Sequence, residues 1–248
     1  MPSAPLAGLR VLITRPAGQG ADEWATAFAA AGALALPYPT VAIVPPDSWH
    51  ALDEALARIA GYDWVVFTSQ TTVSFVRERL PGRCFPRGMR AQIAAVGPAT
   101  ARALEDAGAV VALLPEDSRQ EGLIEAFQAL PAGTRVLLPL AEGGRTLLAE
   151  SLRARGCRLD VVTVYRTQPK GDLPPPPAFD VATFASPSAL RAFLAHAGRE
   201  SLEGKTVAVI GPTTAKEATA NGIHPVVADS PSVDALILAM AHSCQGDP

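Results

Sequence analysis

The chain contains the same pattern twice, and this internal repetition constrains its fold more than any other feature. Residues 94–108 (AAVGPATARALEDAG) align without a gap with residues 208–222 (AVIGPTTAKEATANG). The similarity continues upstream and downstream of these segments. We therefore define a long repeated unit B, with copies B1 (about 62–130) and B2 (about 179–243).

A second, shorter unit also recurs. Residues 8–41 and residues 133–167 each begin with a β-rich run, continue through a glycine-containing loop into an amphipathic helical pattern, and end in a second strand. Gly32 and Gly156 occupy the position of a helix C-cap in the two copies. We call these copies A1 and A2, so the order along the chain is A1-B1-A2-B2.

Each unit alternates short apolar strands with helical patterns of about 10–14 residues, which is typical of a parallel sheet covered by helices on both faces. One A unit and one B unit together supply the strands and helices of one small doubly wound domain. The sequence therefore predicts an α/β protein with two homologous domains. The expected buried strands read RVLIT, WVVFTS, IAAVG, RVLLP, VATFAS and TVAVIG.

The repeats alone leave two ways of pairing the units. A tandem pairing joins A1 to B1 and A2 to B2, whereas an interleaved pairing joins A1 to B2 and makes B1-A2 an inserted domain. β-Branched runs that end in proline clusters occur near the end of both A units, at 38–46 and 161–177. Two such runs side by side would form a two-stranded connector between the domains, and this favours the interleaved pairing.

The composition narrows the class of protein. Hydrophobic residues make up 48% of the chain and charged residues 18%, which suits a folded protein with a buried core. A net charge of -3 and an aromatic content of 6% argue against nucleic-acid binding. The cysteines and histidines lack metal-ligand spacing. We find neither a signal peptide nor an apolar run of about 18 residues, so we expect a cytoplasmic protein without a membrane span, and a monomer because no amphipathic segment is left over.

Strand-to-helix turns in both B units are rich in small polar residues. In open α/β sheets, ligands bind at the carboxyl ends of the strands, where the first backbone N–H groups of each helix lack partners and favour anions. Ser and Thr side chains at these turns can cap the helix and also donate to a ligand. The alternative is ordinary helix capping, which needs no ligand. The candidate anion-binding residues are Thr68, Ser69, Gly97 and Thr100 in B1, and Ser186, Ser188, Gly211, Thr213 and Thr214 in B2.

The same turns lack the sequence motifs of two other kinds of site, the phosphate-binding P-loop and the serine nucleophile elbow. No lysine follows the glycines as it does in a phosphate-binding P-loop, which argues against nucleoside triphosphates. No G-x-S-x-G elbow surrounds Ser69 or Ser186, so neither serine is predicted to be a nucleophile.

A series of motifs, taken in order, resembles the uroporphyrinogen-III synthase (HemD) family: VLITRP, VVFTSQTTV, AAVGPATARAL, LDVVTVYRT, FASPSALRAF and VAVIGPTTAKEA. The resemblance covers nearly the whole chain, and IGPTTA after FASPSA is its most specific part. It implies two flavodoxin-like domains joined by a two-stranded β connector. Domain 1 would then consist of residues 1–38 with 170–248, and domain 2 of residues 43–166, which is the interleaved pairing.

The resemblance also implies a function. The family closes the linear tetrapyrrole hydroxymethylbilane into a ring, inverts ring D and releases water, giving uroporphyrinogen III for haem biosynthesis. No cofactor or metal is expected, and the substrate is a polycarboxylate that hydroxymethylbilane synthase would hand over. Two domains facing each other would surround this substrate with helix N-termini, which explains how a chain of net charge -3 can bind a polyanion.

Departure of the substrate hydroxyl requires a proton donor or a positioned hydrogen bond, and Tyr165 in VVTVYRT matches the tyrosine that the family is proposed to use. A phenol keeps its proton at neutral pH and can donate it. The corresponding stretch of A1, PTVA, has no tyrosine, and an asymmetric reaction requires such a difference between the halves. The alternative is a strand tyrosine that packs at the connector.

The first loops of A1 and A2 differ in charge. Arg15, in ITRP, resembles an arginine of the family and can pair with a substrate carboxylate. The matching loop of A2, LPLAEGGR, offers Gly143 as a candidate binding residue but has Leu140 where many relatives have an arginine. Arg145 either takes over that role or is a solvated helix residue.

A second class of function remains open, namely a non-catalytic, two-lobed binding protein that closes on a small anion. Such a protein would share the fold and the anion-binding turns. It would not steer the closure of hydroxymethylbilane, so the isomer formed in its presence distinguishes the two functions.

Overall fold

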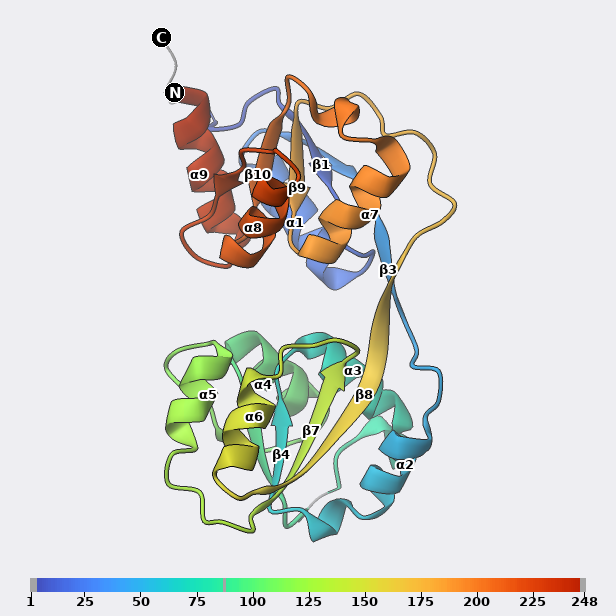
Figure 1. Cartoon of the computed structure of the whole chain (residues 1–248), viewed down its shortest axis with the longest axis vertical. Helices are drawn as coiled ribbons and strands as arrows, with labels where there is room; N and C mark the ends of the chain where they lie inside the picture. Colours follow the sequence, from blue (N-terminus) through green and yellow to red (C-terminus); the bar gives the residue numbers. More distant parts are fainter. Residues whose placement is uncertain (1–3, 87, 246–248) are drawn as a thin grey trace. The chain divides into compact units, whose positions relative to one another are not determined.

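The computed structural model describes residues 4–86 and 88–245. Their contacts divide the chain into two compact units. Unit 1 comprises the described residues of Met1–Ile43 and Thr167–Pro248, and unit 2 comprises those of Val44–Arg166. In each unit, helices cover a central sheet (Figure 1).

Unit 1 is built around a five-stranded sheet in which every strand pair is parallel. A1 thus shares one sheet with B2. The elements of unit 1 are β1 (Arg10–Ile13), α1 (Gln19–Ala30), β2 (Leu34–Pro37), β9 (Val181–Phe184), α7 (Pro187–Ala197), η3 (Glu200–Leu202), β10 (Thr206–Val209), α8 (Pro212–Ala220), β11 (Val226–Val227) and α9 (Val233–Gln245).

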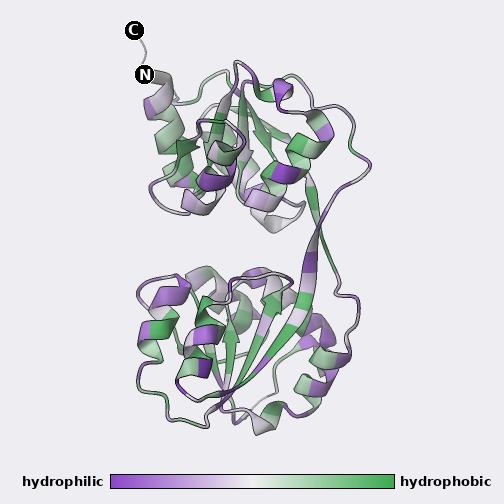
Figure 2. Cartoon of the chain, viewed as in Figure 1, coloured by the Kyte–Doolittle hydropathy of each residue, from purple (hydrophilic) through white to green (hydrophobic). Residues whose placement is uncertain are grey.

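Both faces of this sheet are buried, because successive residues of a strand point to opposite faces. On one face the strands pack against α1 and α9, around Phe28 and Met240. On the other face they pack against α7 and α8, around Phe193 and Ala218. The strands are accordingly among the most hydrophobic segments of the chain (Figure 2). Continuous apolar strands of this kind are the reason why the sequence predicts a parallel sheet.

Unit 2 is built around a six-stranded sheet that combines B1 with A2. Its elements, together with the strand that leads into it, are β3 (Val41–Val44), α2 (His50–Ala57), η1 (Ile59–Gly61), β4 (Trp64–Phe67), α3 (Gln70–Arg79), η2 (Pro81–Arg83), β5 (Gln92–Ala95), α4 (Pro98–Asp106), β6 (Val111–Leu113), α5 (Gln120–Ala126), β7 (Arg135–Ala141), α6 (Leu147–Ala154) and β8 (Arg158–Pro169).

The two sheets have the same strand order. Unit 1 reads β2-β1-β9-β10-β11, and unit 2 reads β8-β7-β4-β5-β6 with β3 added beside β8. Each order is the flavodoxin-like order 2-1-3-4-5 if the strands are counted from the start of the A unit. In unit 2, α2, α3 and α4 pack on one face around Leu52 and Leu104, and α5 and α6 pack on the other around Leu123 and Leu152. The predicted fold, two doubly wound parallel-sheet domains, is confirmed.

Glycines end the first helix of each A unit, as the sequence predicts. Gly32 follows α1 and Gly156 follows α6, with φ values of 88° and 78°. These values lie in the left-handed region that favours glycine, so the helix can stop there and turn into the next strand.

The chain passes between the units twice, along β3 and β8, and these two strands are neighbours in the sheet. Within unit 1, the Lys170 N–H donates to the Thr40 carbonyl at 2.9 Å. Within unit 2, the Arg166 guanidinium donates to the Pro45 carbonyl at 3.2 Å and pairs with Asp47. The strands overlap the two β-branched runs, 38–46 and 161–177, from which the sequence predicts a connector, but β8 ends at Pro169.

The same ion pair aligns the amino ends of the central strands in both units. In unit 1, the Arg10 N–H and guanidinium donate to Asp180 at 2.8–3.0 Å. In unit 2, the Arg135 N–H donates to Asp63 at 2.8 Å. These bonds hold the pKa of both carboxyls below their usual range. Their stabilising effect is therefore present at neutral pH and is lost as acid protonates the carboxylates.

Within residues 4–86 and 88–245, we find no helix that is both long enough and apolar enough to cross a bilayer.

The structure generates a prediction about independent folding, which the division into units suggests but does not test. We expect residues 43–166, expressed alone, to fold, because the continuous stretch Val44–Arg166 holds strands β4 to β7 and most of β8 with helices on both faces. Circular dichroism and a cooperative thermal transition would measure this. A matched fragment, residues 1–130, contains A1 without B2 and should remain unfolded in its first forty or so residues, as amide hydrogen exchange would detect. Protection of A1 in that fragment would contradict the interleaved domains.

Candidate active site

The sequence-predicted residues gather at the carboxyl ends of the central strands. The strand order reverses between β1 and β9 in unit 1 and between β7 and β4 in unit 2. Ligands of open α/β sheets bind outside the carboxyl ends at such reversal points. In unit 1, Arg15 follows β1, Ser186 and Ser188 follow β9, and Gly211, Thr213 and Thr214 follow β10. In unit 2, Gly143 follows β7, Thr68 and Ser69 follow β4, Gly97 and Thr100 follow β5, and Tyr165 lies in β8 beside β7.

Arg15 is a half-buried cation at the start of α1. Its guanidinium lies over the Trp24 ring at 4.8 Å from the ring centroid. Gly20 permits this position, because a Cβ there would lie 2.9 Å from the Arg15 Nη2. Burial lowers the pKa of Arg15, and the charge of Glu23 opposes this shift. No carboxylate of the described chain forms an ion pair with Arg15, so its charge is available to an anionic ligand.

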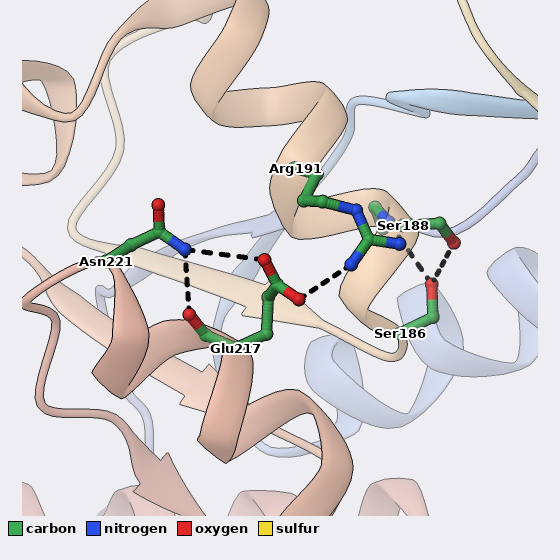
Figure 3. A network of polar contacts seen from close by, with 6 residues as sticks. Ser186, Ser188, Arg191, Glu217 and Asn221 are labelled. Atoms are coloured by element: carbon green, nitrogen blue, oxygen red, sulfur yellow. Dashed lines mark hydrogen bonds and ion pairs between the residues drawn. The ribbon is translucent and has the colours of Figure 1, made fainter.

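Ser186 is the N-cap of α7, where its hydroxyl accepts from the Ala189 N–H at 3.2 Å. The hydroxyls of Ser186 and Ser188 lie 3.0 Å apart, so one donates to the other (Figure 3). Both side chains are half-buried. The pair therefore caps the helix and still has hydrogen-bonding capacity for a ligand.

A salt bridge holds α7 beside α8 (Figure 3). Arg191 of α7 donates to Glu217 of α8 at 2.6 Å, and Asn221 donates to the Glu217 carbonyl at 2.8 Å. The equivalent positions of B1 are Ser74 and Ala103, which cannot form an ion pair. The link therefore fixes the spacing of two candidate helix N-termini in unit 1 only.

The Gly-Pro turn of B2 begins α8. Gly211 is the N-cap, and no side chain caps this helix. Thr213 is exposed, whereas the Thr214 side chain is buried. No hydrogen bond of the Thr214 hydroxyl is found in the described chain. The turn thus offers backbone N–H groups and a hydroxyl to a ligand.

The turn after β4 is capped in the same way as the turn after β9. Ser69 is the N-cap of α3 and accepts from the Thr72 N–H at 3.1 Å, while the two hydroxyls of Ser69 and Thr72 lie 2.8 Å apart. Thr68 is half-buried. Neither Ser69 nor Ser186 hydrogen-bonds to a histidine or a carboxylate within the described residues. That these serines are not nucleophiles stays a prediction.

The two Gly-Pro turns differ in their surroundings. Gly97 begins α4, again without a side-chain cap, and a Cβ there would lie 3.0 Å from the Ser118 Cβ. At Gly211 a Cβ would meet nothing within 4 Å. Both residues have extended backbone that any residue adopts, so conformation does not require glycine. Gly97 makes room for Ser118, whereas the space above Gly211 is open to a ligand. Thr100, in the first turn of α4, is buried like Thr214.

Tyr165 lies in β8 opposite Ala141, the last residue of β7. Its carbonyl accepts from the Glu142 N–H at 2.8 Å, so its backbone is joined to the loop that contains Gly143. The half-buried Tyr165 ring stacks on Phe75 at 5.6 Å and 17°. The hydroxyls of Tyr38 and Tyr62 donate to the Pro174 carbonyl and the Asp160 carboxylate. The Tyr165 hydroxyl, by contrast, has no hydrogen-bond partner in the part of the chain that is described.

The loop after β7 has a different character from the loop after β1. Leu140 is buried, 7% exposed, and packs with Leu138 and Leu148 in the core of unit 2. Gly143 has a φ of 63°, which favours glycine, and Arg145 is exposed. The position equivalent to Arg15 is therefore occupied by a core side chain, and unit 2 has no buried guanidinium there.

Sequence reasoning misses a network of buried threonines in unit 1. The Thr14 hydroxyl donates to the Thr183 carbonyl at 2.7 Å, and the Thr183 hydroxyl donates to the Leu12 carbonyl at 2.8 Å. The Thr40 hydroxyl donates to the Ala189 carbonyl at 2.9 Å. Together these bonds join β1, β9, the start of β3 and the first turn of α7. Comparison of the two repeats is the sequence signal that points to this network. The equivalents of Thr14 and Thr183 in unit 2 are Pro139 and Val66, which have no side-chain hydroxyl.

Known proteins resemble this chain over most of its length. A family model described as Uroporphyrinogen-III synthase HemD matches residues 22–238. The uroporphyrinogen-III synthase of Synechococcus elongatus is 36% identical over 176 residues, covering 70% of this chain and 66% of that enzyme. A protein of Methanothermobacter thermautotrophicus is 30% identical over 253 residues, covering 95% of this chain and 98% of that protein.

Solved structures share the fold. Uroporphyrinogen-III synthetase from Helicobacter pylori aligns with a TM-score of 0.65 at 19% identity, over 95% of this chain and 99% of that chain. A mutant uroporphyrinogen III synthase from Thermus thermophilus aligns with a TM-score of 0.61 at 18% identity, over 97% of this chain and 100% of that chain. At these identities the likeness concerns the architecture.

The contrast between the two glycines generates a stability prediction. Gly211→Ser should leave the free energy of unfolding unchanged or raise it by a few tenths of a kcal/mol, because serine is a good N-cap and meets no neighbour. Gly97→Ser should lower it by about 1 kcal/mol, because the new Cβ presses on Ser118. Urea denaturation of both variants measures the difference. Equal destabilisation would mean that Gly211 has a structural role as well.

Proposed function

The chain belongs to the uroporphyrinogen-III synthase HemD family, and on this premise we infer that it closes hydroxymethylbilane into uroporphyrinogen III, with inversion of ring D and loss of water. It is an enzyme of tetrapyrrole biosynthesis. The observation that carries this conclusion is the family match across residues 22–238, which includes the central strands of unit 2 and most of unit 1. The site residues named below are our proposal and rest on the geometry of the carboxyl ends.

We assign binding of the carboxylate-rich substrate to local anion-binding groups, so the chain as a whole does not need a large positive net charge. The N-cap residues of α4 and α8 are glycines, which bring no capping side chain, and the N-termini of these helices attract anions. Arg15 adds one half-buried guanidinium with which no carboxylate of the described residues forms an ion pair. The hydroxyls of Ser186, Ser188 and Thr68 supply further donors.

Tyr165 is assigned the role of proton donor to the departing hydroxyl. Its hydroxyl differs from those of Tyr38 and Tyr62, because both of the latter already donate to protein acceptors. A hydroxyl that is left without a protein partner on a half-buried ring is available to a substrate oxygen. The C–O bond of the hydroxymethyl group breaks with its electron pair on oxygen, and the phenol proton converts that oxygen into water. The pyrrole ring that carries the group supplies electrons to the carbon left behind.

The two units contribute different chemistry. Unit 1 offers the cation at Arg15, and unit 2 offers the phenol at Tyr165 with the buried Leu140 in place of a second arginine. Repeats that remained equivalent would bind both ends of a linear substrate in the same way. Their divergence suits a reaction in which one terminal ring is inverted and the other is not. The bulk of the rate enhancement in this proposal comes from holding the chain so that its two ends meet.

The non-catalytic binding protein is not favoured, since the named relatives are enzymes. The cytoplasmic location, the monomeric state and the hand-over of substrate from hydroxymethylbilane synthase remain predictions.

The isomer formed from hydroxymethylbilane tests the function directly. Purified protein should yield the type III product, whereas spontaneous closure without inversion yields type I. Chromatography of the oxidised porphyrins separates the isomers. A heat-denatured sample is the control for spontaneous closure. A product that remains type I would contradict the assigned activity and support a binding protein.

Tyr165→Phe tests the proposed donor. The variant keeps the ring and its stacking but loses the proton, so we expect turnover to fall about 10–100-fold with the type III product retained. Tyr62→Phe is a matched control in the same unit, because its hydroxyl bonds to Asp160 and not to a ligand. That control should lower the free energy of unfolding by about 1 kcal/mol without changing turnover. Normal turnover of Tyr165→Phe across the pH range would show that the proton comes from elsewhere.

A further inference from the structure

A row of contacting side chains in unit 2 ends at Tyr165. The Tyr165 ring stacks on Phe75 of α3, and Phe75 contacts Trp49, the N-cap residue of α2, at 6.1 Å and 32°. The Arg79 guanidinium covers the Trp49 ring at 5.3 Å. Asp53 of α2 accepts two hydrogen bonds from Arg79, at 2.6 and 2.9 Å. We propose that Phe75 is a positioning residue that fixes where the Tyr165 hydroxyl lies; this inference rests on the function proposed for Tyr165.

The backbone of Tyr165 is already fixed. Its strand pairs with β7, and its carbonyl accepts from the Glu142 N–H. What remains free is rotation of the side chain about its own bonds. The hydroxyl has no hydrogen bond within the described residues, so no polar contact restrains it. The direction of the O–H group is therefore set by ring packing alone, and the nearly parallel Phe75 ring is the aromatic contact that Tyr165 makes.

Phe75 is itself restrained from its other side. Phe75 and Arg79 are four residues apart on α3 and so lie on the same face of the helix. Trp49 sits between them from α2, and the Arg79–Asp53 bonds tie α3 to α2. Trp49, Phe75 and Tyr165 are all half-buried. These three rings thus lie at the edge of the hydrophobic core of unit 2, whereas rings inside that core, such as Phe67 and Phe85, are buried.

The repeat shows that this support is not a general requirement of the fold. The B2 residue equivalent to Phe75 is Ala192, which is buried in unit 1. The same helix therefore packs on the same sheet without an aromatic ring at this position. The ring is present only in the unit that carries Tyr165, and a role in positioning Tyr165 accounts for the difference.

A double-mutant cycle tests the proposal, using the full chain. Phe75→Leu should keep the apolar volume but remove the flat surface, lowering kcat roughly 5–20-fold while KM changes less than about 2-fold. In the Tyr165→Phe background, Phe75→Leu should have no further effect on kcat, because the hydroxyl that it positions is gone. Phe75→Tyr, which keeps the stacking surface, should restore kcat to near the wild-type value. Thermal melting of each variant confirms folding.

The outcomes separate this inference from the function on which it rests. If Tyr165→Phe is slow and Phe75→Leu lowers kcat equally in both backgrounds, Phe75 acts through general packing and the inference is overturned. It is also overturned if Phe75→Leu alone leaves kcat unchanged. If Tyr165→Phe has normal turnover, the role proposed for Tyr165 fails and the inference fails with it. Should Phe75→Leu not fold, Trp49→Leu loosens Phe75 from its far side, and its smaller effect on kcat must likewise vanish in the Tyr165→Phe background.

Discussion

The parallel pairing of β1 with β9 is the contact on which the rest of unit 1 depends. Asp180 aligns the amino ends of these strands through Arg10, and the Thr14 hydroxyl joins their carboxyl ends through the Thr183 carbonyl. Because side chains of a strand alternate between faces, a shift of one residue would exchange the two cores of the unit. The same alignment brings the loop of Arg15 beside the N-terminus of α7. The pairing of β1 with β9 therefore sets both the register of the sheet and the geometry at the carboxyl ends of its strands.

The repetition of sequence motifs predicts the two sheets, their helices and the glycines at Gly32 and Gly156, because hydrophobic periodicity and helix caps are local signals. It also predicts which turns lie at the carboxyl ends. It does not predict how Thr100 and Thr214 pack: both side chains are buried. Helix rotation decides this, and rotation follows from tertiary packing that no local pattern encodes.

The remaining part of the candidate site depends on contacts between distant segments. The buried threonine network joins residues that lie more than a hundred positions apart, and threonine in a strand reads as an ordinary β-former. The stack of Tyr165 on Phe75 requires β8 and α3 to pack together, and the local sequence around either residue does not predict this contact. Such features can be predicted from sequence alone only where equivalent positions of the two repeats differ, as Phe75 and Ala192 do.

The interleaved course of the chain has a consequence for synthesis on the ribosome. β1 and β2 emerge first, but the partner that completes their sheet, β9, is made only after the whole of Val44–Arg166, and Arg10 waits through 170 positions for Asp180. The strands β4 to β8 of unit 2 follow one another in the chain without interruption, so this unit can close while translation continues. During that time the nascent A1 segment presents the apolar strands β1 and β2 without their neighbour β9, so these strands stay prone to aggregation until B2 is made.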